Sequence, residues 1–109
     1  MLSGNFHQTA NGRKSYEIFD ATPEILFPIS EILVAEFGCT QPKPPTIGAD
    51  AVITECHKGG IKLNLGWDNW SGFYIFADSI AGDEFVDKIG THLNKLLHIE
   101  KFKEFEEKA

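Results

Sequence analysis

Glu55 and His57 are the two side chains in this chain that are best spaced for acid–base chemistry. They lie two positions apart in segment 51–57, whose residue types predict a β-strand. Side chains at i and i+2 of a strand point to the same face, so a carboxylate and an imidazole would lie side by side there. This spacing is compatible with a small enzyme or ligand-binding domain that uses Glu55 and His57 in a cleft under the proline-rich segment 39–48. A solvated strand face produces the same pair without any chemistry.

The residue patterns of other catalytic and metal sites are absent from the sequence. Cys56 and His57 are adjacent in the predicted strand and therefore point to opposite faces. Cys39 and Cys56, the two cysteines, have no CxxC spacing, which argues against a zinc site or a disulfide framework and favours reduced, structural thiols. His92 and His98 lie six positions apart on a predicted helix, too far for one metal ion. We expect no catalytic residues, no metal and no cofactor.

An aromatic turn at residues 66–74, with the sequence GWDNWSGFY, is the strongest candidate for binding. Trp67, Trp70 and Tyr74 combine rigid apolar area with hydrogen-bonding tips, a composition that is enriched at protein interfaces. The alternative is that both indoles close the end of the sheet over the last helix. If only one indole is buried, the other lies exposed at a hairpin tip beside Asp68 and is the better binding candidate.

Acidic side chains outnumber basic ones, by 16 to 10, for a formal charge of −6. This charge disfavours nucleic acid and anionic membrane surfaces as partners and fits a basic protein. We expect the acids of the aromatic turn, the strand after it and the last helix to meet at one negative edge. The alternative is a solvated surface together with matching of the helix dipole. The candidate partner-binding residues are Asp68, Trp70, Tyr74, Asp78, Asp83, Glu84 and Asp87.

The N-terminal half predicts a hairpin followed by a helix. Asn11-Gly12 is typical of a type I′ turn between strands 5–9 and 15–20, and the second strand carries apolar residues on both faces. Pro23 favours a helix start, Gly38 favours its end, and Pro28 lies deep enough to kink the helix. Segment 39–48 holds three prolines and is expected to cross the surface without joining a strand ladder.

The C-terminal half predicts a meander of strands 51–57, 61–67 and 73–78 and then an amphipathic helix capped by Ser79 or Asp83. Residues 99–109 are expected to form a loosely docked tail that extends this helix or makes a separate turn with Phe102 and Phe105 docked. The chain of 109 residues allows one domain, 1–109. The predicted fold is α+β, an antiparallel sheet of about five strands with two helices in the order ββαβββα.

Residues 59–96, with the sequence GGIKLNLGWDNWSGFYIFADSIAGDEFVDKIGTHLNKL, resemble small bacterial immunity proteins of polymorphic-toxin and contact-dependent growth inhibition systems. Many of these are acidic α+β proteins with a Trp-Asp-x-Trp-Ser-Gly-like turn before a strand and an amphipathic helix. The resemblance implies a protein without catalytic residues that binds a cognate toxin domain, often a nuclease, and blocks its active site or substrate groove. The small enzyme or ligand-binding domain stays open as an alternative, as does a homodimer through the exposed edge of the meander.

Targeting signals are not expected in this chain. The first residues, MLSGNFHQ, lack a basic leader followed by an apolar run, and no stretch approaches the roughly 18 apolar residues of a membrane helix. These features favour a cytoplasmic protein.

Overall fold

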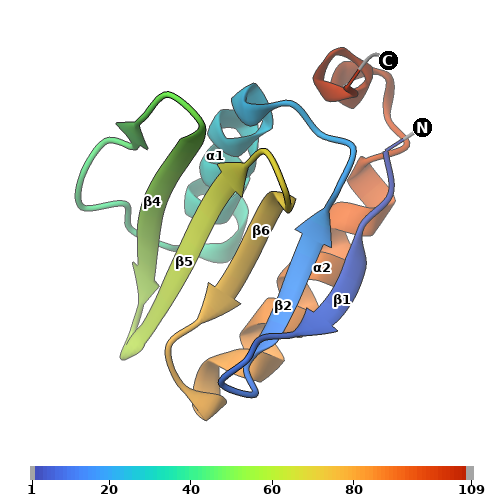
Figure 1. Cartoon of the computed structure of the whole chain (residues 1–109). Coiled ribbons are helices and arrows are strands. Elements are labelled where there is room, and N and C mark those ends of the chain that lie inside the picture. The colour runs from blue at the N-terminus through green and yellow to red at the C-terminus, as the bar shows by residue number, and fades with distance from the viewer. Residues whose placement is uncertain (1, 108–109) are drawn as a thin grey trace.

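An antiparallel sheet of six strands with two α-helices on one face makes up the computed structural model, which describes residues 2–107 (Figure 1). The strands are β1 (Asn5–Gln8), β2 (Lys14–Ile18), β3 (Thr46–Ile47), β4 (Ala51–Lys58), β5 (Ile61–Asp68) and β6 (Gly72–Ala77). The helices are α1 (Leu26–Phe37) and α2 (Asp83–Leu96). The strands lie across the sheet in the order β1-β2-β6-β5-β4-β3. The predicted α+β class is confirmed, and the chain order ββαββββα contains one strand more than predicted.

The additional strand, β3, comes from the proline-rich segment. Thr46 pairs with Ile53 and Ile47 with Val52, while further back the Thr40 amide donates to the His57 carbonyl at 2.8 Å. Proline has no N–H to donate, so the ladder uses the residues on either side of the prolines. The prediction that this segment joins no ladder was therefore wrong, and β4 is paired on both sides.

The first hairpin closes through a longer turn than predicted. A type I′ turn needs positive φ at both central residues, but Gly12 alone has it in this turn, with φ of 82°. The Thr9 amide donates to the Arg13 carbonyl at 2.8 Å, and the Gly12 amide donates to the Thr9 carbonyl at 2.9 Å. A two-residue turn at Asn11-Gly12 is thus replaced by a loop that Thr9 and Arg13 close.

Helix α1 begins later than predicted, and this shift explains how it accommodates Pro28. A short 3-10 turn, η1 (Pro23–Ile25), precedes α1, so Pro28 is its third residue. The first four amides of a helix have no intrahelical acceptor, so a proline in this turn removes no hydrogen bond. The expected deep position of Pro28 is corrected, whereas the helix does end before Gly38, whose φ is 71°.

Helix α2 starts without the predicted side-chain cap. Gly82 precedes it, at the end of the 3-10 turn η2 (Ile80–Gly82), and neither Ser79 nor Asp83 caps an amide of the helix. Asp83 instead accepts from the Lys14 amide at 3.1 Å and from Arg13 Nη1 at 3.2 Å. This carboxylate ties the helix to the first hairpin.

Both helices cover the same face of the sheet. Helix α2 packs across β1, β2 and β6, and α1 packs against β4 and β5, as Figure 1 shows behind the sheet. The buried side chains of the strands point toward these helices; they include Tyr16, Ile18, Leu63, Leu65, Phe73 and Ile75. The opposite face carries no helix among residues 2–107, and its side chains are therefore available to solvent.

The C-terminal tail forms a separate 3-10 turn, η3 (Glu100–Phe105), one of the two forms predicted for it. Phe102 is fully buried, the Thr22 amide donates to the Phe105 carbonyl at 2.7 Å, and Ala21 bridges to Glu106. These contacts fix residues up to 107 against the start of η1. Residues 108–109 of the predicted tail lie outside the described part.

Candidate functional site

The side of the sheet opposite α1 and α2, which we call the open face, carries no helix in the described part of the chain. Alternation along the strands places it opposite the core. Its residues are Ser15, Glu17, Ile53, Glu55, His57, Lys62, Asn64, Gly66, Asp68, Tyr74 and Phe76. Most are only partly buried, so the face mixes charge, hydroxyl groups and aromatic area.

Two aromatic side chains of β6 form a ridge along the middle of the open face. The ring centroids of Tyr74 and Phe76 lie 6.0 Å apart with an interplanar angle of 23°, a stacked arrangement. The Tyr74 ring lies over Gly66 of the neighbouring strand, where the Cβ of any other residue would collide with the phenol. Gly66 thus sets the position of Tyr74, and this aromatic ridge divides the open face into two hollows.

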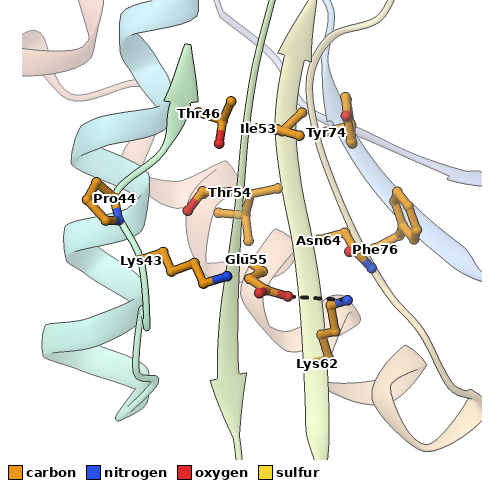
Figure 2. Close-up of a pocket in the computed structure, with 11 residues that line it drawn as sticks. Lys43, Pro44, Thr46, Ile53, Thr54, Glu55, Lys62, Asn64, Tyr74 and Phe76 are labelled. Atoms are coloured by element: carbon orange, nitrogen blue, oxygen red, sulfur yellow. Dashed lines mark ion pairs between the residues drawn. The ribbon is translucent and has the colours of Figure 1, made fainter.

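The first hollow, which we call the strap hollow, lies between the aromatic ridge and the proline-rich segment 39–48. Its volume is about 450 Å³. Figure 2 shows Lys43 and Pro44 on one side, Tyr74 and Phe76 on the other, and Glu55 and Lys62 joined by an ion pair across the floor. The sequence placed Glu55 and His57 in a cleft beneath this segment. Glu55 does line the strap hollow with Lys43 and Pro44, whereas His57 is not among the residues that line it.

On the floor of the strap hollow, the charges of Glu55 and Lys62 neutralise each other. Lys62 Nζ lies 3.2 Å from Glu55 Oε2 and 3.6 Å from Asp78 Oδ2, and Asn64 Nδ2 donates to Asp78 Oδ1 at 2.5 Å. The hydrogen bond from Lys62 lowers the pKa of Glu55, and the same bond raises the pKa of Lys62. Glu55 is therefore held as a carboxylate, whereas a general base works best with a pKa near the working pH.

His57 does lie beside Glu55, as its spacing predicted. Its Nε2 is 3.5 Å from Glu55 Oε2, a contact that becomes an ion pair when the imidazole is protonated. This nitrogen is enclosed by neighbouring atoms and has no hydrogen-bond partner among the described residues. A separation of 3.5 Å is too long for a strong hydrogen bond. The pair has the proximity that acid–base chemistry needs, but Lys62 competes for the same carboxylate oxygen.

The second hollow, which we call the acid hollow, lies on the other side of the aromatic ridge and measures about 250 Å³. Its lining combines two carboxylates with hydroxyl groups and the two rings of the ridge: Thr9, Ser15, Glu17, Asp68, Ser71, Tyr74 and Phe76. Ser15 Oγ donates to Glu17 Oε2 at 3.2 Å, and His7 Nε2 lies 3.9 Å from Glu17 Oε1. Burial raises the pKa of Tyr74, and the Asp68 carboxylate raises it further.

Asp68 also builds the aromatic turn that follows β5. Its Oδ1 accepts hydrogen bonds from the Trp70 amide at 2.9 Å and the Ser71 amide at 2.6 Å. Short acidic side chains favour turns by this bonding to the amides that follow them. Gly72 completes the turn with φ of 68°.

The two tryptophans of the turn differ in burial. Trp67 points toward the core, and its Nε1 donates to the Ala21 carbonyl at 2.7 Å. Trp70 is 80% exposed at the hairpin tip. Trp67 is thus partly buried against the core and Trp70 is exposed beside Asp68, so the candidate for binding is Trp70.

The acidic candidates do not share one edge, so that expectation is corrected. Asp68 lies opposite Gly72, whereas the Asp78 amide bonds to the Lys62 carbonyl six residues away along β5. At roughly 3.4 Å per residue the two ends are about 20 Å apart. Antiparallel pairing of β5 with β6 is the cause, because it returns the chain to the far end before α2 begins.

The three acids at the start of α2 are on the helix-covered side and are paired within the chain. Asp83 bonds Arg13 at 3.2 Å, Asp87 bonds Lys14 at 2.9 Å, and Glu84 lies 3.8 Å from Lys88. The structure therefore groups Asp68 with Trp70 and Tyr74 and separates them from Asp78, Asp83, Glu84 and Asp87.

Glu17, Lys62 and Phe76 belong to the open face but were not among the predicted site residues. Alternation along each strand was enough to place Lys62 and Phe76 on a face opposite the core. Nothing in the sequence indicated which residues lie beside Glu17, because Glu17 meets Tyr74 only through the pairing of β2 with β6. That pairing joins segments nearly 60 residues apart in the sequence.

Comparison with protein-family models, with curated proteins and with solved structures finds no match to this chain. Among residues 2–107, no group of three or more histidine, cysteine or acidic side chains is arranged to hold a metal ion. Within the same residues, no helix combines the length and apolar character needed to cross a membrane.

Proposed function

We propose that this protein is an immunity-type binding module that neutralises a cognate bacterial toxin domain, nuclease-like and basic, by covering it with the open face. The observation that carries the proposal is the uncovered sheet face with its aromatic ridge and the exposed Trp70 beside Asp68. An exposed aromatic residue next to a charged rim is the composition of energetically dominant sites in protein interfaces.

Charge and sequence resemblance support the same proposal. The chain carries a net charge of −6, which speeds association with a basic protein and disfavours nucleic acid or an anionic membrane. The segment that resembles immunity proteins, residues 59–96, supplies β5, the aromatic turn, β6 and α2. An immunity protein of this type acts in the cytoplasm, and that location is part of the proposal.

Co-expression with the candidate toxin tests this function. The C-terminal domain encoded by the upstream neighbouring gene is expressed alone and together with this protein, and cell survival and co-purification are scored. We expect rescue and a stable complex whose affinity falls with added salt. Failure of both, with the neighbour toxic and this protein folded, would refute the pairing.

A matched pair of variants locates the interface. Trp70→Ala should weaken the complex by at least about 2 kcal/mol, or roughly thirtyfold, if the indole is a central anchor. Phe27→Ala on the outer face of α1 is the control, because Phe27 is also exposed, at 40%, but lies on the helix side. Equal affinities of both variants and the parent would place the interface away from the exposed indole of the aromatic turn.

A small enzyme or ligand-binding domain is the second candidate, favoured by the strap hollow and by the proximity of His57 to Glu55. The volume of the strap hollow, about 450 Å³, lies within the range of small-molecule sites. A panel of hydrolase substrates should detect any such activity, and the double variant Glu55→Ala, His57→Ala should abolish it. Full activity in the double variant would remove this candidate.

A homodimer is a third arrangement, and the structure changes which edge it would use. Both edges of the β4-β5-β6 meander are paired, with β2 on one side and β3 on the other, so the edge predicted to be exposed is covered. The sheet ends at β1 on one side and at the two-residue strand β3 on the other, and neither has a described neighbour on its outer side. Sedimentation velocity would reveal a dimer.

A further inference from the structure

The two hollows of the open face differ in how many of their polar groups already have partners. In the strap hollow, Glu55, Lys62 and Asn64 bond within one network that includes Asp78. In the acid hollow, Asp68 uses only Oδ1 for the turn, and Oδ2 accepts no hydrogen bond from the described residues. The acid hollow therefore keeps acceptor capacity for a ligand.

Glu17 adds a second carboxylate to the acid hollow, and its partners there are weak. The Ser15 hydroxyl donates to it at 3.2 Å, and the imidazole of His7 is 3.9 Å away. The Glu17 side chain is 31% exposed, so a donor from outside can reach it. No lysine or arginine forms an ion pair with Glu17 or Asp68 among residues 2–107, unlike the acids of α2.

The aromatic ridge supplies aromatic surface beside these carboxylates. Tyr74 and Phe76 both line the acid hollow, and their rings are stacked with the small interplanar angle of 23°. Aromatic faces attract cations, and the planar guanidinium of arginine can stack on them while its N–H groups bond to carboxylates. A lysine ammonium is a compact point charge without a planar face, so it cannot stack flat on a ring while bonding to a carboxylate in the same plane.

We propose that the acid hollow binds the guanidinium group of an arginine on the partner protein, stacked against the Tyr74–Phe76 ridge and hydrogen-bonded to Asp68 and Glu17. This inference rests on the proposed function, because it specifies the chemistry of the basic partner. Charge complementarity commits the hollow to this occupant, because two carboxylates and two aromatic rings line it and no lysine or arginine does.

A blocked arginine, N-acetyl-arginine methylamide, is the direct probe and needs no knowledge of the partner. It is titrated into the ¹⁵N-labelled protein to millimolar concentration, with blocked lysine and blocked citrulline in parallel. We expect saturable shifts centred on the amides of residues 17, 68 and 74 for arginine, weaker ones for lysine, and none for citrulline, which is nearly isosteric but uncharged. Equal shifts for citrulline, no saturable shift for arginine, or shifts centred on the strap hollow would overturn the proposal.

Conservative variants test the two carboxylates. Asp68→Asn and Glu17→Gln keep size and one oxygen acceptor but remove the charge, and each should weaken arginine binding by up to about fivefold, the effect of losing one exposed ion pair. Glu84→Gln is the matched control, since Glu84 is exposed and lies on α2, away from the open face. Unchanged affinity in both hollow variants would contradict the assignment.

The co-expression experiment separates failure of this inference from failure of the proposed function. The informative variant combines Asp68→Asn and Glu17→Gln. If it rescues cells as the parent protein does and binds the toxin domain with the same affinity, the immunity function stands and the arginine site is wrong. If blocked arginine binds as described but no rescue or complex is found, the arginine site stands and the toxin pairing is wrong.

Discussion

Asp68 builds the aromatic turn and, in our proposal, also binds the partner, and substitutions there test both roles. Asp68→Ala removes the oxygen that accepts from the Trp70 amide at 2.9 Å and the Ser71 amide at 2.6 Å. Loss of a comparable side-chain acceptor at a helix N-terminus costs about 1 kcal/mol, and two bonds to a charged acceptor raise the expected cost to roughly 1–2 kcal/mol. We therefore expect a clear loss of stability in the alanine variant.

Asp68→Asn should keep the turn and lose the charge. Its side-chain oxygen can occupy the position of Oδ1 and accept the same two amides. We expect its stability to remain within about 0.5 kcal/mol of the parent protein. Binding to the basic partner should fall in both variants, because neither one carries the carboxylate.

Urea unfolding followed by far-UV circular dichroism measures the stability difference without relying on the neighbouring indole. A loss of 1–2 kcal/mol should also lower Tm by roughly 4–10 °C in a domain of this size. Calorimetric titration with the co-purified toxin domain measures binding, and Glu84→Gln again serves as the control. An asparagine variant as unstable as alanine would refute the account of the turn, and an asparagine variant with full affinity would refute the role of the charge.

Three further predictions follow from buried or paired groups. Phe102→Ala removes a fully buried ring and should destabilise the protein by about 3–5 kcal/mol in urea unfolding. Lys62 lowers the pKa of Glu55 below its ordinary value of 4.5, so the ionised carboxylate stabilises the folded protein at pH values above 4.5. This stabilisation is lost as the pH falls through the lowered pKa, and Glu55→Gln should therefore flatten the acid limb of a stability–pH profile. Burial raises the pKa of Cys56 to about 11, so Cys56 should resist alkylation at about pH 8 until the protein unfolds.

Matched measurements decide each of these three. Phe19→Ala, at a ring that is 65% exposed, should change stability by less than about 0.5 kcal/mol, and a similar loss in both phenylalanine variants would contradict the packing argument. Glu31→Gln, at an exposed acid of α1, is the control variant. An acid limb for Glu55→Gln as steep as that of the parent protein would show that Lys62 does not stabilise the Glu55 carboxylate. Rapid alkylation of Cys56 in the folded protein would mean that β4 opens locally.

The candidate site was partly predictable because its residues lie close together in the sequence. The aromatic turn, the exposed indole beside Asp68 and the proximity of Glu55 to His57 follow from turn chemistry and from the period of two along a strand. Whether Trp67 or Trp70 would be exposed was not predictable from the turn alone. The Ala21 carbonyl decides it by accepting from Trp67 Nε1, and Ala21 lies 46 residues away.

The sequence by itself determined the α+β class, the meander and the amphipathic last helix, since these depend on hydrophobic periodicity and on local turn residues. It did not determine which strands are neighbours. The pairing of β2 with β6 brings Glu17 to Tyr74, and the antiparallel return of β6 carries Asp78 about 20 Å from Asp68. Charges that look clustered along the chain are thus separated, and a hollow with two carboxylates forms from distant segments. Only the tertiary structure decided this, because strand order depends on long-range packing against α1 and α2 rather than on any local preference.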